Sequence, residues 1–546
     1  MKKTLILSAL LVSAAATAQN LNPVVEVTNI YAREATGIEK PEQLRALPDS
    51  VFKFNLDFDY SVKSTPYKGA YEFNPYLVQL RPAARLSGEH TLYLKAGAGF
   101  TVHPELDVVW NPVRTRNLRV DIYAVHNSYW GGYRGIGLQE GMFDYNGKSL
   151  GTGLGSRTQA GVDFLAAYKG GRFTAYSEYS NVAATDFYLQ SNPSTRLSHK
   201  GQVQLRVQSN PGTRFLYNVG TRVTYLMGPA DKEFHTVSDV SLGVRMGKNN
   251  ALRLAGGFET VSFAGETGFK VEVAPHYTLG TKRWNLDLGV KYSYIGKGAT
   301  AYQFKGGVLF PDVNVSFRIA DAAVLQAAVT GGDRLVTYES LLEDNLYVNG
   351  FDWYRDVIVT RFDAMGGIRG SIGGKFSYDI KGGYKWTDNA YAWSYTLDGS
   401  GRILPGMTYA SPLRTAYVNA RINWNSENLD AMAFASYGYT PKPNLQETPI
   451  QQNLFVPAPF RANGHIFYKW GGRIKVGPTV EIRSKMKGRN GGIPGYVDLG
   501  LYAEYSLGRK LGFWVKGGNF LNQTIQRTPF YAEGGVFGSA GVKLLL

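Results

Sequence analysis

Few side chains of this sequence stand at spacings that catalysis or metal binding requires. His126 and Ser128 are separated by one residue, which puts a candidate general base near a hydroxyl at the outer end of a predicted strand. A histidine near the end of a strand, beside a serine in the following loop, explains the same pair without any catalytic role. The seven histidines are dispersed, with no close pair suited to a metal, and the sequence contains no cysteine. We therefore expect no enzymatic activity, no cofactor and no metal site.

Aromatic residues in the longer predicted loops are the more promising contact residues. Exposed aromatic side chains can stack on a ligand or anchor a protein partner, because each presents a large and rigid apolar area. Alternatively, aromatic residues at these positions serve only to pack the loops against one another. The sequence therefore offers six candidate ligand or partner contacts: Tyr129, Trp130, Trp353, Tyr354, Tyr391 and Trp393.

The N-terminus predicts export from the cytoplasm. Residues 1–18 combine Lys2 and Lys3 with an apolar run and the small-residue site Ala16-Thr17-Ala18, which is the pattern of a secretory signal peptide. The mature chain is expected to begin near Gln19. Without cysteine, the exported chain has neither disulfides nor an acylated lipoprotein cysteine.

The composition indicates an all-β membrane protein. Beyond the signal peptide no apolar run approaches the ~18–20 residues that a transmembrane helix needs. The mean hydropathy is −0.21, yet the chain contains 36 Tyr and 64 Gly. These features are typical of a transmembrane β-barrel, in which lipid-facing and lumen-facing residues alternate and the average hydropathy stays low. A large secreted all-β adhesin is the alternative.

Alternation favours the barrel. In "WNLDLGVKYSY" at 284–294, apolar residues fall on one face of an extended chain, and Asn285, Asp287, Lys291 and Ser293 fall on the other with Gly289. Similar patterns recur along the chain, and many run for about ten residues, the length with which a tilted strand crosses a bilayer. Tyr and Trp gather near the strand ends, as interfacial girdles require.

The turns give the expected strand number. Ten short links rich in Gly, Asn, Pro and Asp separate alternating segments, and longer connections lie between them at roughly 127–155, 182–199, 331–356, 387–412 and 439–463. Ten short turns imply about 22 antiparallel strands, with short periplasmic turns and long extracellular loops. The last strand is expected to pair with the first, near 91–102, so that no edge is left exposed. The short links are 114–117, 169–172, 210–213, 247–250, 280–283, 320–323, 372–375, 425–428, 477–479 and 507–510.

The charge balance is basic, with a formal net charge of +16. Lysines and arginines that line a wet lumen and the lipid headgroup borders account for it, and outer-membrane lipid and lipopolysaccharide are expected partners. Alternatively, a basic lumen or loop crown attracts an anionic solute or partner. We expect no nucleic-acid partner at this location.

The closing stretch, with Asn519, Phe520, Leu521 and Asn522 followed by Tyr531 and a run of glycines, resembles the C-terminal strands of TonB-dependent receptors. The expected strand number is also that of this family, and the resemblance covers roughly 91–546. It implies a receptor-type barrel in the outer membrane of a Gram-negative bacterium. One departure is the last residue, Leu546, where the family usually ends in an aromatic residue.

A second departure lies before the barrel. The family carries a plug domain of well over a hundred residues, whereas here residues 19–90 form only an N-terminal arm or vestigial plug segment. Val24, Val25, Val27 and Thr28 are the candidate periplasmic coupling strand, because the family begins with a similar valine-rich segment. The alternative for these residues, which a short valine-rich pattern favours, is an ordinary strand or an extended periplasmic arm.

A barrel of this width must be filled, because 22-stranded barrels have a lumen that is normally plugged. The short arm, inward-folded loops or another subunit could fill it. We therefore expect a transport-type barrel for solute passage with a blocked lumen. The alternative is a non-transporting structural subunit of an outer-membrane assembly or secretion complex, which would bind other outer-membrane or periplasmic proteins.

Overall fold

The computed structural model describes most of the chain after residue 90, all of it within one compact unit, Ala46–Leu546. The signal peptide, the arm at 19–90 with Val24, Val25, Val27 and Thr28, and the loop residues Trp353 and Tyr354 lie outside the described residues. No helix in the described part is long and apolar enough to cross a membrane. The described residues are 91–100, 103–134, 137–139, 142–144, 149–187, 194–210, 212–229, 231–247, 249–281, 283–296, 306–320, 322–344, 347, 357–397, 403–410, 412–441, 455–488, 491–528, 531–533 and 535–546.

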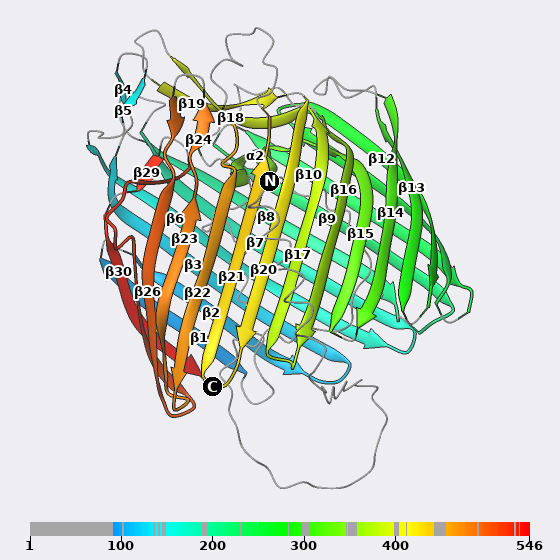
Figure 1. Ribbon diagram of the computed structural model, residues 1–546, viewed down its shortest axis with the longest axis horizontal. Helices are drawn as coiled ribbons and strands as arrows, with labels where there is room; N and C mark the ends of the chain where they lie inside the picture. Colours follow the sequence, from blue (N-terminus) through cyan, green and yellow to red (C-terminus); the bar gives the residue numbers. More distant parts are fainter. Residues whose placement is uncertain are drawn as a thin grey trace, which may run out of the picture. The chain divides into compact units, whose positions relative to one another are not determined.

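The fold is a closed antiparallel β-barrel with 22 wall strands, as the turn pattern predicted (Figure 1). The wall strands, in the order in which they pair around the ring, are β1 (Leu92–Phe100), β2 (Glu105–Arg114), β3 (Leu118–Arg134), β6 (Ser149–Tyr168), β7 (Gly171–Asp186), β8 (Ser194–Ser209), β9 (Phe215–Met227), β10 (Lys232–Arg245), β11 (Ala251–Phe263), β12 (Glu266–Gly280), β13 (Trp284–Ile295), β14 (Gly306–Ala320), β15 (Ala323–Leu335), β16 (Val357–Ile372), β17 (Phe376–Asp388), β20 (Leu413–Asn425), β21 (Leu429–Tyr439), β22 (Phe460–Trp470), β23 (Ile474–Arg483), β26 (Tyr496–Leu507), β27 (Leu511–Gly518) and β30 (Phe537–Leu545).

The last strand is not a free edge. β30 pairs antiparallel with β1 through eight residue pairs, from Tyr93 opposite Leu545 to Phe100 opposite Gly538. Beyond this ladder the amide of Leu546 donates to the carbonyl of Leu92 at 2.8 Å. Closure therefore satisfies the backbone groups that an open sheet would expose to lipid, and the expected pairing of the first and last strands is confirmed.

The two faces of the wall are those that the alternation predicted. On β13, Leu288 is 42% exposed and Tyr292 is 48% exposed, because their outward face packs against no other described part of the protein. On the same strand Asp287, Lys291 and Ser293 point inward and are buried. An apolar outward belt around a polar interior is the surface of a barrel that spans the outer membrane.

Nine of the ten predicted short links lie between successive wall strands. The tenth prediction, 477–479, was wrong, because Gly477 and Pro478 lie inside β23. The turn is instead at Gly471 and Gly472, which have positive φ values of 57° and 65°. Gly477 lies close to the carbonyl of Ile466, and both Gly477 and Pro478 are absent from the β22–β23 ladder, so this pair marks an irregularity within the strand.

The long connections carry short elements of their own, which are β4 (Gly137–Gln139), β5 (Met142–Asp144), α2 (Tyr338–Asp344), β18 (Ala390–Leu397), β19 (Ile403–Ala410), β24 (Met486–Gly488), β25 (Gly491–Ile493), β28 (Ile525–Thr528) and β29 (Tyr531–Glu533). Two predicted loops, 127–155 and 182–199, are largely strand, because β3, β6, β7 and β8 have 16 to 20 residues and pair beyond the length that crosses a bilayer. Tyr129 and Trp130 therefore lie on β3.

Candidate functional site in the lumen

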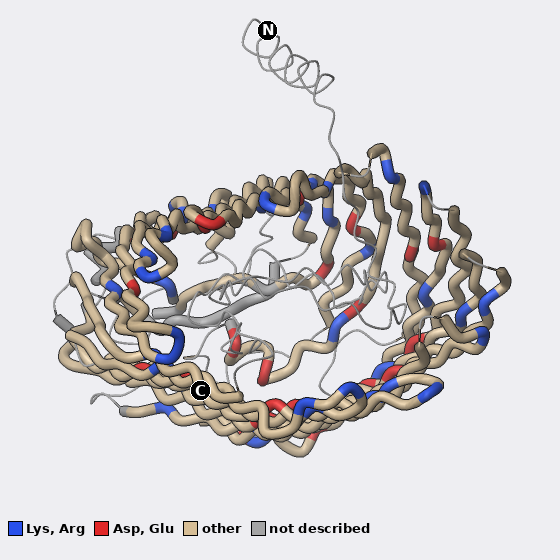
Figure 2. Tube along the Cα trace, turned by 90° about the horizontal axis from the view of Figure 1, so that it is seen from below, with Lys and Arg blue, Asp and Glu red and all other residues tan. Residues whose placement is uncertain are grey.

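The connection from β15 to β16 folds against the inner wall of the barrel. Figure 2, which looks along the barrel, shows described chain inside the ring of strands. α2 begins at a local cap, where the amide of Ser340 donates to Thr337 Oγ1 at 3.0 Å and the amide of Thr337 donates to Ser340 Oγ at 3.2 Å. These reciprocal bonds satisfy amides that the first helical turn leaves without partners.

Apolar packing holds one side of α2 to strands β9 and β11. Tyr338 is fully buried, and its ring centroid lies 4.9 Å from that of Phe263. Leu226 of β9 and Leu341 and Leu342 of α2 belong to the same cluster. A short helix has little stability of its own, so this packing determines where it lies.

A buried carboxylate of the wall binds the first turn of α2. Glu233 of β10 is 2% exposed and accepts hydrogen bonds from the amides of Tyr338 and Glu339, the second at 3.0 Å. Two backbone donors of the helix are thereby satisfied by one side chain from a strand 105 residues earlier.

Ion pairs fix the charged side of α2. Lys200 Nζ of β8 lies 3.1 Å from Glu339 Oε1 and 3.7 Å from Glu343 Oε1. His235 Nδ1 of β10 lies 3.7 Å from Glu339 Oε2. Burial alone would raise the pKa of Glu339, but the nearby charges of His235 and Lys200 outweigh it, so the pKa lies below its ordinary value. Glu339 is therefore ionised at neutral pH.

A second buried set of charges supports the first. Glu259 Oε1 of β11 lies 3.0 Å from His235 Nε2, and its Oε2 lies 3.0 Å from Lys270 Nζ of β12. Lys270 also lies 3.6 Å from Asp333 Oδ1 of β15, which accepts a hydrogen bond from Ser293 at 2.8 Å. Each of these buried charges has an opposite charge beside it, which offsets the cost of removing it from water.

The same connection reaches β7, β8 and β29. Tyr347 stacks on Tyr531 of β29, whose hydroxyl donates to Asp186 of β7 at 3.0 Å. Arg196 of β8 donates to the carbonyl of Tyr347 at 3.2 Å and pairs with Asp186 at 3.1 Å. We call the contacts of Tyr338, Glu339 and Tyr347 with the wall the α2 anchor.

The predicted aromatic contacts lie in different surroundings. Trp393 of β18 is 6% exposed and belongs to a cluster with Tyr133, Phe187, Tyr395 and Phe455, against which Tyr129 packs. Trp130 is 56% exposed. For Tyr391 the structure describes the backbone, which pairs with Tyr409 of β19. The structure thus brings Tyr129 and Trp393 together and leaves Trp130 apart from them.

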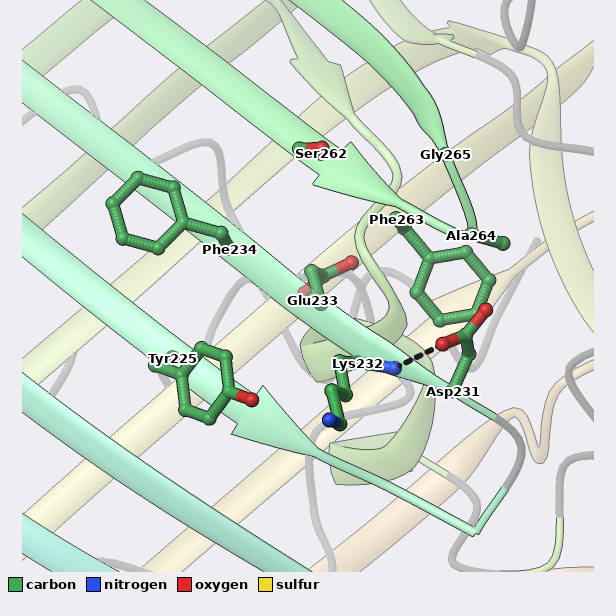
Figure 3. Close-up of a pocket in the computed structure, with 9 residues that line it drawn as sticks. All are labelled: Tyr225, Asp231, Lys232, Glu233, Phe234, Ser262, Phe263, Ala264 and Gly265. Carbon is green, nitrogen blue, oxygen red and sulfur yellow. Dashed lines mark hydrogen bonds between the residues drawn. The ribbon is translucent and has the colours of Figure 1, made fainter.

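A hollow of about 320 Å³ lies at the tips of the β9–β10 and β11–β12 hairpins (Figure 3). Tyr225 and Phe234 project to one side of their strands and are 44% and 47% exposed, whereas Glu233 turns to the buried side. The hollow shares Glu233 and Phe263 with the α2 anchor, so it is the outer side of the same region.

The His126–Ser128 pair is in contact but faces outward. His126 Nε2 lies 3.1 Å from Ser128 Oγ, and Nδ1 lies 2.8 Å from Thr158 Oγ1 on β6. His126, Thr158, Asn181 and His199 stand directly opposite one another on β3, β6, β7 and β8. Ser128 is 8% exposed. Among the described residues no group of three or more His, Asp or Glu side chains is arranged to hold a metal ion.

Sequence reasoning missed Lys200, Glu233, His235 and Glu339. The signal available was weak: inward positions of β8 and β10 carry charges, and the loop segment "YESLLED" at 338–344 is acidic and amphipathic. Which of these charges meet depends on contacts between residues more than a hundred positions apart. No local pattern reveals such pairs.

No protein-family model matches the sequence, and no curated protein matches it. Solved structures do match the fold. The FrpB iron transporter from Neisseria meningitidis has a TM-score of 0.60 at 10% identity, over 83% of this chain and 81% of that chain. A mutant ferric enterobactin receptor from Pseudomonas aeruginosa in complex with enterobactin gives 0.60 at 10% identity, over the same shares of 83% and 81%. The siderophore receptor PirA from Acinetobacter baumannii gives 0.59 at 9% identity, over 83% and 80%.

Identities near 10% establish the fold alone. The chain is thus an outer-membrane β-barrel similar in fold to TonB-dependent receptors, and the predicted resemblance to that family is confirmed at the level of the barrel fold. The closing motif has a structural reason. Asn519 adopts a positive φ of 52°, and its side chain bonds to the backbone of Gln523 and Gly535, which joins the ends of β27, β28 and β30.

Proposed function

We propose that this protein is a transport-type barrel for solute passage, whose lumen is narrowed by the connection between β15 and β16. The observation that carries the proposal is the α2 anchor, in which Glu233, Lys200 and His235 hold α2 against the inner wall. A loop folded inward and fixed by buried charges narrows a barrel that would otherwise leak. Receptors and an iron transporter with similar barrels support the same function.

The arm at 19–90 contributes to filling the lumen, and Val24–Thr28 pairs as a strand with a periplasmic coupling protein. Trp130, exposed on the outward face of β3, and the candidate residues Tyr129, Trp353, Tyr354, Tyr391 and Trp393 contribute ligand or partner contacts directly or by supporting the loops. The protein is not an enzyme, and burial of Ser128 supports this.

The non-transporting structural subunit is the second candidate function. The observation that favours it is the cluster around Trp393, which joins residues of β3, the β7 end, β18 and the β21–β22 connection into one buried group. A set of loops packed so closely suits a permanently closed barrel.

A reversible cross-link separates the two functions. The chain has no cysteine, so Leu226→Cys with Leu342→Cys introduces the only thiol pair, on two residues of one cluster. The pair is bridged with a short reducible bifunctional reagent, and uptake of arabinose into proteoliposomes is measured. We also measure uptake for a double variant that combines Lys200→Gln with Glu339→Gln, which loosens α2. Lys232→Gln, on the exposed rim, is the control.

For the transport barrel, loosening α2 raises arabinose uptake several-fold over the unchanged protein and over Lys232→Gln. Bridging Cys at 226 and 342 lowers uptake, and reduction restores it. Equal uptake in all forms contradicts the proposal and supports the structural subunit. Heat-modifiable migration on gels confirms that each variant is a folded barrel.

The coupling strand has its own test. Val25→Pro removes one backbone donor and fixes φ, so strand pairing at this position fails. If coupling to a periplasmic protein drives uptake, cells with Val25→Pro lose uptake while the barrel still assembles. Unchanged uptake in cells would contradict the coupling strand and leave the α2 result untouched.

A further inference from the structure

A group of arginines lines the inner wall at the end of β22 and β23 that lies away from their short turn. Arg461 of β22 and Arg483 of β23 stand directly opposite each other in the ladder, and both point inward. Like charges directly opposite each other on one face destabilise a sheet. Arg527 of β28 reaches the same place, since its carbonyl accepts a hydrogen bond from Arg483 Nη1 at 3.2 Å.

The nearby carboxylates are already engaged by other groups. Asp498 and Glu481 both pair with Arg527. Glu481 also accepts a hydrogen bond from the hydroxyl of Tyr496, and Asp498 accepts one from the amide of Asn519 at 2.7 Å. These two acids therefore balance Arg527 before they balance Arg483.

Arg483 is buried with two donors unused. Its exposed fraction is 7%, and its Nε and Nη2 atoms have no hydrogen-bond partner among the described residues. The ring of Tyr496 lies 4.9 Å from its Cζ, which supports the flat guanidinium from one side. Leaving a buried charged donor without an acceptor costs more than leaving a neutral one, so an arginine kept in this state calls for an anion.

We propose that Arg483 is the centre of an oxyanion-binding site in the lumen, which takes a carboxylate or phosphate group of a solute. Nε–H and Nη2–H lie on one edge of the guanidinium and point in the same direction. That edge matches two oxygens of one carboxylate or phosphate and binds them in parallel. Arg461, opposite, adds the second positive charge that such a group favours.

An oxyanion site of this kind names the chemical class of the solute. It rests on the proposed transport function only in assuming that the solute passes through the lumen. Binding itself does not depend on transport. The experiment therefore measures binding to the full chain in detergent by isothermal titration, with inorganic phosphate and citrate as separate titrants at constant chloride.

Three variants make the test specific. Arg483→Gln removes the charge and the paired donors, and Arg483→Lys keeps the charge without the two-donor edge. Arg206→Gln is the matched control, because Arg206 also points inward but is paired with Asp239 at 2.8 Å and Asn218 at 2.8 Å. Heat-modifiable migration is checked for each.

We expect the unchanged protein and Arg206→Gln to bind at least one of the two anions. Arg483→Gln should lose about tenfold or more in affinity, because hydrogen bonds to charged groups are lost. Arg483→Lys should bind more weakly than the unchanged protein. Binding of phosphate alone assigns the site to phosphate groups, and binding of citrate alone assigns it to carboxylates.

No binding of either anion to the unchanged protein, or equal binding by Arg483→Gln, overturns the proposal. Equal binding by Arg483→Lys overturns the paired-donor geometry on which it stands. If binding depends on Arg483 but arabinose uptake ignores α2, the anion site stands and the transport function fails. If arabinose uptake depends on α2 but anion binding does not depend on Arg483, the transport function stands and the anion site is wrong.

Discussion

Two parts of the inner wall carry buried charge in different ways. Between β8 and β15, Lys200, His235 and Lys270 each lie within 4 Å of a carboxylate, and the set holds α2. On β22 and β23, Arg461 faces Arg483, and in the described part of the chain the Nε and Nη2 atoms of Arg483 have no acceptor. The two parts share one barrel and the same alternating strands, yet their charges are balanced to different degrees.

The difference separates structural charge from binding charge. Removing a charge from water is costly, and a partner of opposite sign offsets this cost only when it is close and well placed. The paired set around α2 meets that condition and so fixes a loop. A buried guanidinium without such a partner weakens the fold, and its presence is explained by a ligand that supplies the acceptors.

The largest effect is expected at the paired side. Lys270→Met leaves Glu259 and Asp333 buried without their main cation, so it should lower the free energy of unfolding by about 3–5 kcal/mol. Urea titration of the barrel folded in lipid vesicles measures this. Lys232→Met, at an exposed position directly before Glu233 on β10, is the control and should change stability by less than about 0.5 kcal/mol. A similar small loss for Lys270→Met would show that the paired set does not hold the wall.

The same kind of substitution should act differently at the arginine side. Arg483→Met removes a buried charge that lacks acceptors on two nitrogens among the described residues, and replaces it with an apolar side chain of similar length. We expect the free energy of unfolding to stay the same or rise by up to about 1 kcal/mol in anion-free buffer. A loss of more than about 2 kcal/mol would mean that Arg483 is a structural charge like those around α2, and that the two parts of the wall do not differ.

The smallest effect is expected from acid. The pKa of Glu339 lies below its ordinary value in the folded protein, so its contribution is complete above the ordinary Glu pKa of about 4.3 and is lost as the pH falls from there. Lys200, His235 and Arg222 face Glu339 from β8, β10 and β9. Protease cleavage within 336–347 should therefore stay slow from neutral pH down to about 5 and become faster below about 4. In Glu339→Gln the rate should be higher at neutral pH and depend less on acid.

Much of the wall could be predicted from the sequence, because its signals are local. A period of two distinguishes the face with Leu288 from the face with Lys291, and glycine or asparagine marks the tight turns. The same local rule failed at Gly477 and Pro478, which resemble a turn but lie within β23. These two residues are left out of the ladder with β22, but they still pair with β26 on the other side, which keeps them within the strand.

The interior could not be predicted in the same way. Glu233 binds α2 across 105 positions of the sequence, and Arg527 reaches Glu481 across 46. Such contacts depend on which strand ends the closed barrel brings together, and no repeating pattern records them. Trp393 shows the same limit, since an aromatic residue in a predicted loop gives no sign of whether it is buried or exposed.

Side chains of β8 and β10 fix α2 to the inner wall. Hydrogen–deuterium exchange of the full chain in detergent tests this attachment most directly, because the amides of Tyr338 and Glu339 donate to Glu233. We expect these two amides to exchange about a hundredfold or more slowly than those of the exposed turn at Arg509 and Lys510, and Glu233→Leu to remove most of this protection. Exchange at Tyr338 and Glu339 as fast as at Arg509 and Lys510 in the unchanged protein would contradict it.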